Sequence, residues 1–404
     1  MRILIVTPHF YPESFKCNDM AFELQKRGYK VSVMTAIPDY PEGKFFKGYG
    51  VFRRRREIVN GVEVHRSLII PRGSGSAFRL ALNYLSYTFF ASLKAVWFGL
   101  TCKYDAIIVH ETSPVMVGIP AVIIKKIQHI PLYFWVLDLW PESLIAAGGI
   151  KNKTVIGMFE KLTKWIYRNS NKILISSAGF RESICKKEQM FHNKIVFFPN
   201  WIDEVLQSNT NTTDVPNLNN GFNILFAGNI GEAQDFPHVL DAALKLRNRS
   251  NIHFNFVGDG RKRKWVEEFI ENKNLSDSVH CWGQYPLSAM PSFFNQADIL
   301  FLSLKKSPIF ELTVPAKLQA YMSSGKPVVS MIDGEGAAVI AEADCGWSIP
   351  AESPEKLVEL LIELSNTDSS ILTQKGANGK TFSRKHYRFD SCMDHLCSML
   401  PSER

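Results

Sequence analysis

Short runs of β-forming residues alternate with helical stretches along nearly the whole of this 404-residue chain. In the first half the strand-like runs are 2–7, 30–35, 62–70, 105–110, 131–137, 172–177 and 195–198. After a polar run the alternation restarts, and the later strand-like runs are 222–228, 252–258, 279–282, 297–302, 327–331 and 346–349. Strands that alternate with helices form parallel sheets with helices on both faces. The pattern therefore predicts two similar α/β domains.

The domain boundaries follow from composition and length. A chain of this length exceeds one core of typical size. The polar run 208–220 has almost no apolar content and reads as part of a linker. We expect a first domain at 1–202, a linker at 203–220 and a second domain at 221–385. Segment 386–404 is expected to form a helix that returns toward the first domain.

Charge and cysteine usage narrow the class of protein. The 47 basic against 39 acidic residues give a net charge of +8, which favours anionic partners such as nucleotides, anionic lipids or nucleic acid. The seven cysteines are scattered and form no CxxC pair, so neither a disulfide framework nor a zinc site is indicated. The first ten residues read as a strand instead of a secretion signal. We expect a protein of the reducing cytosol.

The segment 313–336 contains the strongest single indication of a ligand site. Thr313 and Pro315 form a helix start signal and Gly325 ends the helix. In a parallel sheet this junction lies at the carboxyl edge, where the N–H groups of a helix face an anion. Lys317 adds a full positive charge in the first turn. The alternative is an ordinary connection that carries a surface lysine.

Glycine-containing turns follow several strands of the second domain. Glycines after neighbouring strands let a nucleotide diphosphate approach the backbone closely. Each turn is weak evidence alone, but with Lys317 they predict a common anion site at one sheet edge. The turn residues are Gly228, Asn229, Gly231, Gly258, Gly260, Asp333, Gly334, Glu335 and Gly336.

Polar clusters also follow two strands of the first domain. His110 ends one strand, and Asp138 and Glu142 follow the next. A histidine and carboxylates at the mouth of a sheet are suited to binding sugar hydroxyls or moving protons. The alternatives are a structurally bonded imidazole and acidic residues that cap the following helix. Capping and ligand contact are compatible.

Several function classes lack their motifs. The first strand-to-helix loop, 7–18, contains no glycine, which argues against a nicotinamide or flavin dehydrogenase. No HExxH, paired cysteine ligands or DxD motif is present, so we expect neither a metal nor a cofactor. A leaving diphosphate would then be neutralised by lysine, arginine and helix N-termini.

A basic and aromatic stretch lies at 44–56 and includes four consecutive arginines at 53–56. Such a stretch suits an anionic membrane surface, although a solvated basic loop is an equal alternative. Nucleic-acid binding is not expected because no recognised motif accompanies the stretch. The apolar run 80–100 is interrupted by Asn83 and Lys94, and predicts a core or interfacial helix more than a membrane span.

With these residues assembled, the chain resembles the retaining glycosyltransferases of family 4. More narrowly, it resembles the WbuB-like branch associated with transfer of N-acetyl-L-fucosamine. The segments that carry the resemblance are HETSP at 110–114, DLWPES at 138–143, FPNW at 198–201, FAGNIG at 226–231, VGDG at 257–260, TVPAKLQAYMSSGKPVV at 313–329 and DGEG at 333–336. The resemblance implies the GT-B fold, in which two Rossmann-like domains face each other across a cleft.

The resemblance also implies substrates and roles. The donor would be a UDP-sugar and the acceptor an undecaprenyl-diphosphate-linked sugar in O-antigen or capsule assembly, with the enzyme cytoplasmic and peripheral at the inner face of the cell membrane. His110, Asp138 and Glu142 would face the reacting sugar, and Lys317 would stabilise the departing phosphate, whose oxygen would accept the acceptor's proton. Donor contacts in the second domain would further include the turn residues named above with Trp282, Gly283 and Gln284, and Asn18 would contribute from the first domain.

The chain departs from the family pattern in two places. Two glutamates that the family commonly carries are replaced by Leu312 and Ala320, and Gln319, Glu311 and Glu335 are the nearest substitutes. The first loop lacks the family's paired glycines and has Phe15, Lys16 and Asn18 there instead. Two rival functions follow: a UDP-N-acetylhexosamine 2-epimerase of the same fold and a catalytically silent nucleotide-sugar-binding subunit.

Overall fold

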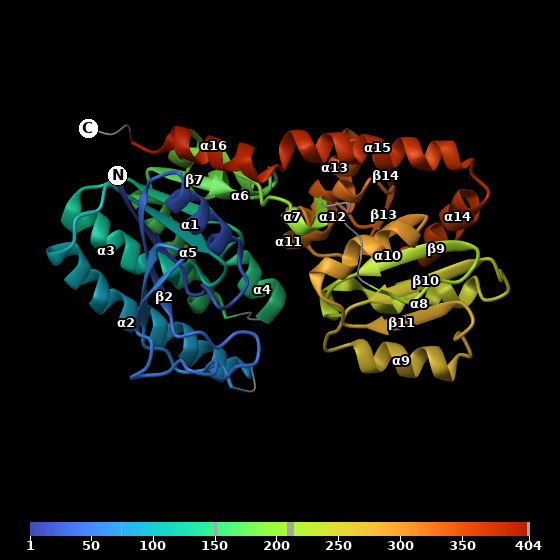
Figure 1. The fold of residues 1–404 in the computed structure, drawn as a ribbon, viewed down its shortest axis with the longest axis horizontal. Coiled ribbons are helices and arrows are strands. Elements are labelled where there is room, and N and C mark those ends of the chain that lie inside the picture. Colours follow the sequence, from blue (N-terminus) through green and yellow to red (C-terminus); the bar gives the residue numbers. More distant parts are fainter. Residues whose placement is uncertain (74, 149–151, 208–213, 402–404) are drawn as a thin grey trace. The chain divides into compact units, whose positions relative to one another are not determined.

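The computed structural model describes residues 1–73, 75–148, 152–207 and 214–401 (Figure 1). The chain divides into two compact units. The first comprises Met1–Pro199 with Met393–Arg404, and the second comprises Asn200–Cys392. Each unit is built around its own parallel sheet, and each is described by itself below.

The sheet of the first unit has the strand order β3-β4-β2-β1-β5-β6-β7-β8. Its strands are β1 Arg2–Val6, β2 Lys30–Ala36, β3 Arg56–Val59, β4 Val62–Ser67, β5 Ala106–Glu111, β6 Leu132–Val136, β7 Lys172–Ile175 and β8 Ile195–Phe197. All neighbouring strands are parallel except β3 and β4, which form an antiparallel hairpin. The central strands β5 and β6 are buried along their whole length, as expected for a sheet covered on both faces.

Helices cover this sheet. They are α1 Lys16–Lys26, α2 Ala77–Thr101, α3 Gly118–Gln128, α4 Glu142–Gly148, α5 Lys153–Asn169 and α6 Phe180–Lys187. Ser76 caps the 25-residue helix α2, because its hydroxyl accepts the backbone N–H of Arg79, and the helix packs against α3 near Gly99. The helix predicted at 80–100 is therefore present. None of the helices in the described ranges is long and apolar enough to cross a membrane.

The second unit has a fully parallel sheet of order β11-β10-β9-β12-β13-β14. Its strands are β9 Phe222–Ala227, β10 Ile252–Val257, β11 Val279–Gly283, β12 Ile299–Ser303, β13 Val328–Met331 and β14 Gly346–Ile349. Its helices are α7 Glu204–Gln207, α8 Phe236–Lys245, α9 Arg263–Asn272, α10 Met290–Gln296, α11 Pro308–Glu311, α12 Ala316–Ser324, α13 Glu335–Glu342, α14 Pro354–Ser365 and α15 Ser369–His386. Buried side chains form one core cluster that includes Phe226 and Phe256 and another that includes Leu225 and Leu318. Every strand-like run predicted for this half corresponds to a strand.

The segments that join the units differ in detail from the expected boundaries. Residues 204–207 of the expected linker form α7, and residues 208–213 lie outside the described ranges. The backbone N–H of Leu218 donates to Gln296 Oε1 at 3.0 Å, so the end of the linker lies along the second unit. The last helix is α16 Phe389–Met399. Its residues from Met393 on belong to the first unit, where Asp394 pairs with Arg27 at 2.6 Å between Oδ1 and Nη1.

Candidate functional site

A cavity of about 500 Å³ opens at the carboxyl edge of the second unit's sheet. Its polar walls come from the ends of β9 and β10, from the residues after β11 and from the first turn of α12, and its apolar walls come from α7, α10 and α12. The predicted site residues among its walls are Gly228, Asn229, Gly258, Gln284 and Lys317. Carboxyl edges are the usual ligand sites of parallel sheets, so this cavity is the candidate functional site.

Gly228 and Gly258 bring three chain segments together at the mouth of the cavity. Both have positive φ, +139° and +144°, a conformation that L side chains rarely adopt. A Cβ on Gly258 would lie 1.9 Å from the carbonyl oxygen of Gly228, and a Cβ on Gly228 would lie 2.4 Å from Lys317 Cε. Glycine is therefore required for the backbones after β9 and β10 to approach each other, and its lack of a side chain at Gly228 leaves space for the end of Lys317.

Lys317 is the most unusual group in the cavity. Its Nζ is buried, lies 3.7 Å from the centroid of the Phe226 ring and has no hydrogen-bond partner within the described structure. Burial lowers the pKa of this amine from 10.5 to about 7. A buried donor without a partner is unfavourable, and a buried ammonium more so, unless an anion completes the site. The cavity therefore has the charge and geometry of an anion site.

The two glycine loops are fixed by their own hydrogen bonds. The backbone N–H of Ile230 donates to the Asp259 carbonyl at 2.9 Å, and that of Gly231 donates to Gln234 Oε1 at 3.2 Å. A Cβ on Gly260 would lie 2.3 Å from the Ile230 carbonyl oxygen. Gly231 and Gly260 are not among the cavity walls. Gly260 lets the two loops lie close together, whereas the contacts of Gly231 are within its own loop.

Some residues at the end of β11 support the cavity wall, and the residues after them line the cavity. Trp282 Nε1 donates to Asn255 Oδ1 at 3.0 Å, and the Gly283 carbonyl accepts the Gly258 N–H at 2.7 Å. Trp282 and Gly283 are not among the cavity walls, whereas Gln284 and the neighbouring Tyr285 line the cavity. Of the three residues predicted in this segment, Gln284 lines the cavity, and its contact with a ligand stays a prediction.

Helix α12 presents one face to the cavity. Ala320 lies on that face, whereas Gln319 is buried away from it and Leu312 is not among the cavity walls. The Tyr321 hydroxyl fixes the helix to β9 by donating to the Ala227 carbonyl at 3.1 Å and accepting the Ala227 N–H at 2.8 Å. A methyl group therefore occupies the wall position where the family pattern has its second glutamate.

The 333–336 turn lies after β13 and is not among the cavity walls. Asp333 Oδ1 accepts the Ala351 N–H at 3.3 Å. Gly334 has a φ of +77°, and a Cβ there would lie 2.0 Å from the Glu311 carbonyl oxygen. Burial raises the pKa of Glu335, with a smaller contribution from Glu342. The structure thus places this predicted group, Gly336 included, at the start of α13 and packs it against the end of α11.

His110 is buried at the end of β5 in the first unit. Its Nδ1 lies 3.2 Å from Thr7 Oγ1, and that hydroxyl donates to the His9 carbonyl at 3.1 Å. His110 Nδ1 must therefore carry the proton, which leaves Nε2 as an acceptor. Burial, with a smaller contribution from His9, lowers the pKa of His110 to about 3. The imidazole is neutral at physiological pH and can accept a hydrogen bond without becoming a strong base.

Asp138, which is half-buried, lies close to a buried carboxylate, Glu111, that the sequence analysis did not single out. Its side chain accepts a hydrogen bond from the Ser143 hydroxyl, and burial raises its pKa. The neighbouring Glu111 is fully buried, and its Oε2 accepts the backbone N–H groups of Leu137 and Asp138 at 3.3 and 3.2 Å. Burial and the charge of Asp138 raise the pKa of Glu111 well above its ordinary value. Glu111 thus holds the turn that positions Asp138.

Glu142 has local partners at the start of α4. It accepts a hydrogen bond from Ser183 Oγ at 3.0 Å and forms an ion pair with Lys187. The second oxygen, Oε2, is buried without a partner in the described structure. Glu142 lies in the first turn of α4, as its alternative interpretation expected, but its contacts are with side chains of α6, and the ion pair ties α4 to α6.

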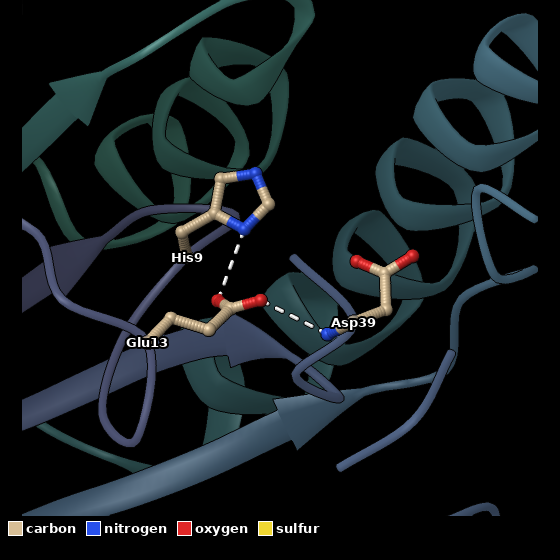
Figure 2. Close-up of side chains that lie close together, drawn as sticks. All are labelled: His9, Glu13 and Asp39. Carbon is tan, nitrogen blue, oxygen red and sulfur yellow. Dashed lines mark hydrogen bonds and ion pairs between the residues drawn. The ribbon is translucent and has the colours of Figure 1, made fainter. Parts of the chain in front are cut away.

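A second polar network, which sequence reasoning missed, surrounds His9 at the carboxyl end of β1. His9 Nδ1 lies 3.0 Å from Glu13 Oε2, and Glu13 Oε1 accepts the Asp39 N–H at 2.9 Å (Figure 2). Arg72 Nη2 lies 2.6 Å from the other ring nitrogen of His9. The side-chain amide of Asn18 donates to the Glu13 carbonyl of the same loop at 2.7 Å. Asn18, predicted to bind the donor, is seen here to brace the β1–α1 loop.

His9, Glu13 and Asp39 are the only group of three or more possible metal ligands within the described ranges. Both ring nitrogens of His9 already have close partners, because Glu13 faces one and the Arg72 guanidinium faces the other. A metal would have to displace one of these contacts, and Arg72 already supplies positive charge. The group does not fit a metal site well.

Comparison with known proteins finds similarity to glycosyltransferases. Residues 221–367 match the family model described as Glycosyl transferases group 1. "Probable glycosyltransferase WbjE" of Pseudomonas aeruginosa is 24% identical over 305 residues, covering 73% of this chain and 74% of that protein. WcaI of Escherichia coli (strain K12), whose name assigns it to colanic acid biosynthesis, is 24% identical over 349 residues, covering 80% and 82%.

Solved structures show the same fold. HepE of Anabaena in complex with UDP has a TM-score of 0.72 at 14% identity, covering 99% of each chain. WaaG, described as a glycosyltransferase involved in lipopolysaccharide biosynthesis, has a TM-score of 0.66 at 14% identity, covering 100% of each chain. Together these comparisons support a group 1 glycosyltransferase. The predicted GT-B fold is confirmed, whereas the narrower WbuB-like assignment stays a prediction.

The family match covers the residues that line the cavity. The matched segment 221–367 contains Gly228, Gly258, Gln284 and Lys317, which line the cavity. The first unit lies outside the segment, so the arrangement around His110 and Asp138 rests on the structure alone. The two parts of the predicted site therefore have different support.

Proposed function

We propose that the chain is a retaining, metal-independent glycosyltransferase that takes its sugar from a UDP donor. The observation that carries the proposal is the buried and unpartnered Nζ of Lys317 at the glycine-lined mouth of a cavity. A diphosphate would supply the missing partner, and the apolar walls suit a nucleoside. HepE, which shares the fold, has been solved with UDP and with UDP-glucose.

The chemistry proposed for this site is electrostatic. As the bond between the sugar and the diphosphate breaks, negative charge grows on the departing oxygen, and a lysine ammonium held near it stabilises that charge. Donor binding would restore the ordinary pKa of Lys317, because a neighbouring anion favours the charged form. The departing oxygen would then accept the proton of the acceptor hydroxyl on the same face of the sugar. Lys317 serves as a stabiliser of charge and not as a base.

The first unit would supply contacts to sugar hydroxyls. The neutral His110 can accept a hydrogen bond at Nε2, and Asp138 is positioned by Glu111. A histidine with a pKa of about 3 would remain neutral throughout the reaction. We therefore assign these groups to orientation of substrate, in which they hold hydroxyl groups and move no proton.

The proposed substrates follow the resemblance and the relatives. WbjE and WcaI carry names from bacterial polysaccharide assembly. Our best assignment is transfer of a deoxyamino sugar, N-acetyl-L-fucosamine, to an undecaprenyl-diphosphate-linked sugar in O-antigen or capsule biosynthesis. Since a lipid-linked acceptor stays in the bilayer, the enzyme would work as a peripheral protein at the inner membrane face.

A specific observation favours one rival. Ala320 leaves the cavity wall without the family's glutamate, as expected of a nucleotide-sugar-binding subunit that has lost catalysis. Calorimetric titration with UDP tests the donor site, and a panel of UDP-sugars with a lipid-diphosphate-linked acceptor tests transfer. UDP binding without transfer by any donor would favour the silent subunit, and epimerised donor in the absence of acceptor would favour the 2-epimerase. Absence of UDP binding would refute the proposed donor site.

A further inference from the structure

Helix α2 of the first unit has an apolar face that nothing in the described structure covers. Its buried face carries Tyr87, Ala91, Ala95 and Phe98 and packs toward α3 and the sheet. The opposite face exposes a stripe of large apolar side chains at helical spacing, each between 44% and 72% exposed: Phe78, Leu85, Phe89, Leu93, Val96, Trp97 and Leu100. A surface helix ordinarily presents polar residues to water, so a stripe of this size marks an interaction surface.

The β3–β4 hairpin and the turn before it add positive charge and further apolar side chains beside this helix. Phe52 is 97% exposed and Ile58 is 74% exposed. Arg53, Arg54 and Arg56 are also exposed. Basic residues among exposed aromatic and aliphatic side chains are typical of surfaces that bind anionic bilayers.

The Arg66 carbonyl of β4 accepts two part-buried hydrogen bonds, one from Arg55 before β3 and one from Lys94 in the middle of α2. Arg55 Nε donates to the Arg66 carbonyl at 2.9 Å, and Lys94 Nζ donates to the same oxygen. Neither cation has a carboxylate within ion-pair distance in the described part of the chain, because the nearby Glu57 pairs with Arg66 instead. Burial, with Arg55 and Arg66, lowers the pKa of Lys94 to about 8. The positive charges of Arg55 and Lys94 are therefore not neutralised by a carboxylate in the described part of the chain.

We propose that the apolar stripe of α2 and the β3–β4 hairpin, with the exposed arginines at 53, 54 and 56, form one docking surface for a bilayer that contains anionic phospholipid. The apolar side chains would enter the boundary between headgroups and acyl chains, and a lipid phosphate would bind at Arg55 and Lys94. This inference extends the proposed function, on which it rests for its biological purpose, by naming the surface that reaches a lipid-linked acceptor.

A second copy of this chain is a poorer occupant. A twofold dimer brings the same patch of both copies together, so the hairpins of two molecules would place Arg53, Arg54 and Arg56 against one another. Like charges at close range oppose such contact. An anionic bilayer satisfies the apolar stripe and the cations at once.

The test is co-sedimentation of the full chain with large vesicles of phosphatidylcholine containing phosphatidylglycerol, without any sugar substrate. Two variants separate the parts of the surface: Phe89→Ser with Leu93→Ser and Trp97→Ser, and Arg53→Ser with Arg54→Ser and Arg56→Ser. The matched control replaces Arg247, Arg249 and Lys273, exposed cations of the second unit, by serine. UDP titration of every variant confirms that the second unit is folded.

We expect the wild type and the control to bind anionic vesicles and to bind neutral vesicles weakly. Each exposed arginine lost should weaken binding roughly fivefold at low salt. The apolar triple variant should lose at least about tenfold, in a manner that salt does not change. Undiminished binding by the apolar triple, or no vesicle binding by a wild type that binds UDP, overturns the inference. Sedimentation of a wild-type dimer that the apolar triple dissociates would overturn it in favour of a self-interface. Vesicle binding without transfer activity would instead count against the proposed function alone.

Discussion

Replacing Lys317 by methionine should make the unliganded protein more stable while it weakens UDP binding. Methionine retains much of the apolar stem and removes the buried amine whose Nζ has no partner. The fall of the Lys317 pKa from 10.5 to about 7 corresponds, at ~1.4 kcal/mol per pH unit, to a cost of about 5 kcal/mol at most for the charged form. Such a cost is comparable to the whole stability of many domains.

The pH dependence fixes the sign of the effect. Between pH 7 and 10.5 the unfolded chain keeps a proton on Lys317 that the folded chain has released, so the contribution of Lys317 to stability rises with pH across this window. Below pH 7 the full cost is present in the wild type and absent in Lys317→Met. Urea unfolding should therefore show the variant most stabilised at about pH 6, with the difference shrinking as pH rises toward 10.5.

UDP supplies the second half of the test. In the wild type, UDP at a hundred times its Kd should add about 2.7 kcal/mol of stability, and the variant should require much more ligand for the same gain. Above about pH 7.5, where the terminal phosphate of UDP is fully ionised, wild-type affinity should fall up to tenfold per pH unit because binding takes up a proton on Lys317. The matched control is Lys306→Met, which removes an exposed lysine. A variant that matches the wild type in stability at pH 6 and in UDP affinity would refute the reasoning.

Three further outcomes are expected. Gly258→Ala should lower the free energy of unfolding by about 3 kcal/mol or more, because the new Cβ would meet the Gly228 carbonyl. The control is Gly157→Ala in α5, where a Cβ would meet no other atom, and it should raise the free energy of unfolding by up to about 1 kcal/mol. Equal urea midpoints for the two variants would contradict this prediction. The pH–rate profile should show no step from His110, whose pKa is about 3. His110→Gln should therefore lower the rate of transfer without changing the shape of the profile near pH 6.5. A step that disappears in the variant would assign a proton-transfer role to His110. EDTA should leave transfer unchanged, and rescue by magnesium after a loss would show that a metal is needed.

The strands were predictable because a covered parallel sheet requires apolar residues on both faces. The runs that became β5 and β6 are apolar nearly throughout, and no other element satisfies that pattern at this length. Strand β3 was missed because its sequence, REIV, alternates charged and apolar residues at a sheet edge. The Asn60-Gly61 pair after it was a usable signal, since both residues have positive φ and close the hairpin.

Side-chain networks were harder to foresee than strands. Glu111 lies next to His110 in the sequence, yet its role depends on accepting the N–H groups of Leu137 and Asp138, which lie on the neighbouring strand's turn. The ring of His9 likewise contacts Arg72, 63 positions away. Periodicity and turn signals describe local backbone and carry no information about such partners. These groups could be identified only after the sheet had brought the strand ends together.

Lys317 and the 333–336 turn were predicted from one rule, and the structure places them differently with respect to the cavity. Both follow a strand and both were predicted to bind the donor from the same general rule about carboxyl edges. The side chain of Lys317 reaches the cavity because Gly228, which directly follows β9, leaves room for its aliphatic stem. Gly334 also has a positive φ, but it packs against the Glu311 carbonyl and precedes the first residue of α13. A strand-end glycine therefore permits close approach without specifying what approaches, and a nearby charge that the fold leaves unpaired is the better guide to a ligand.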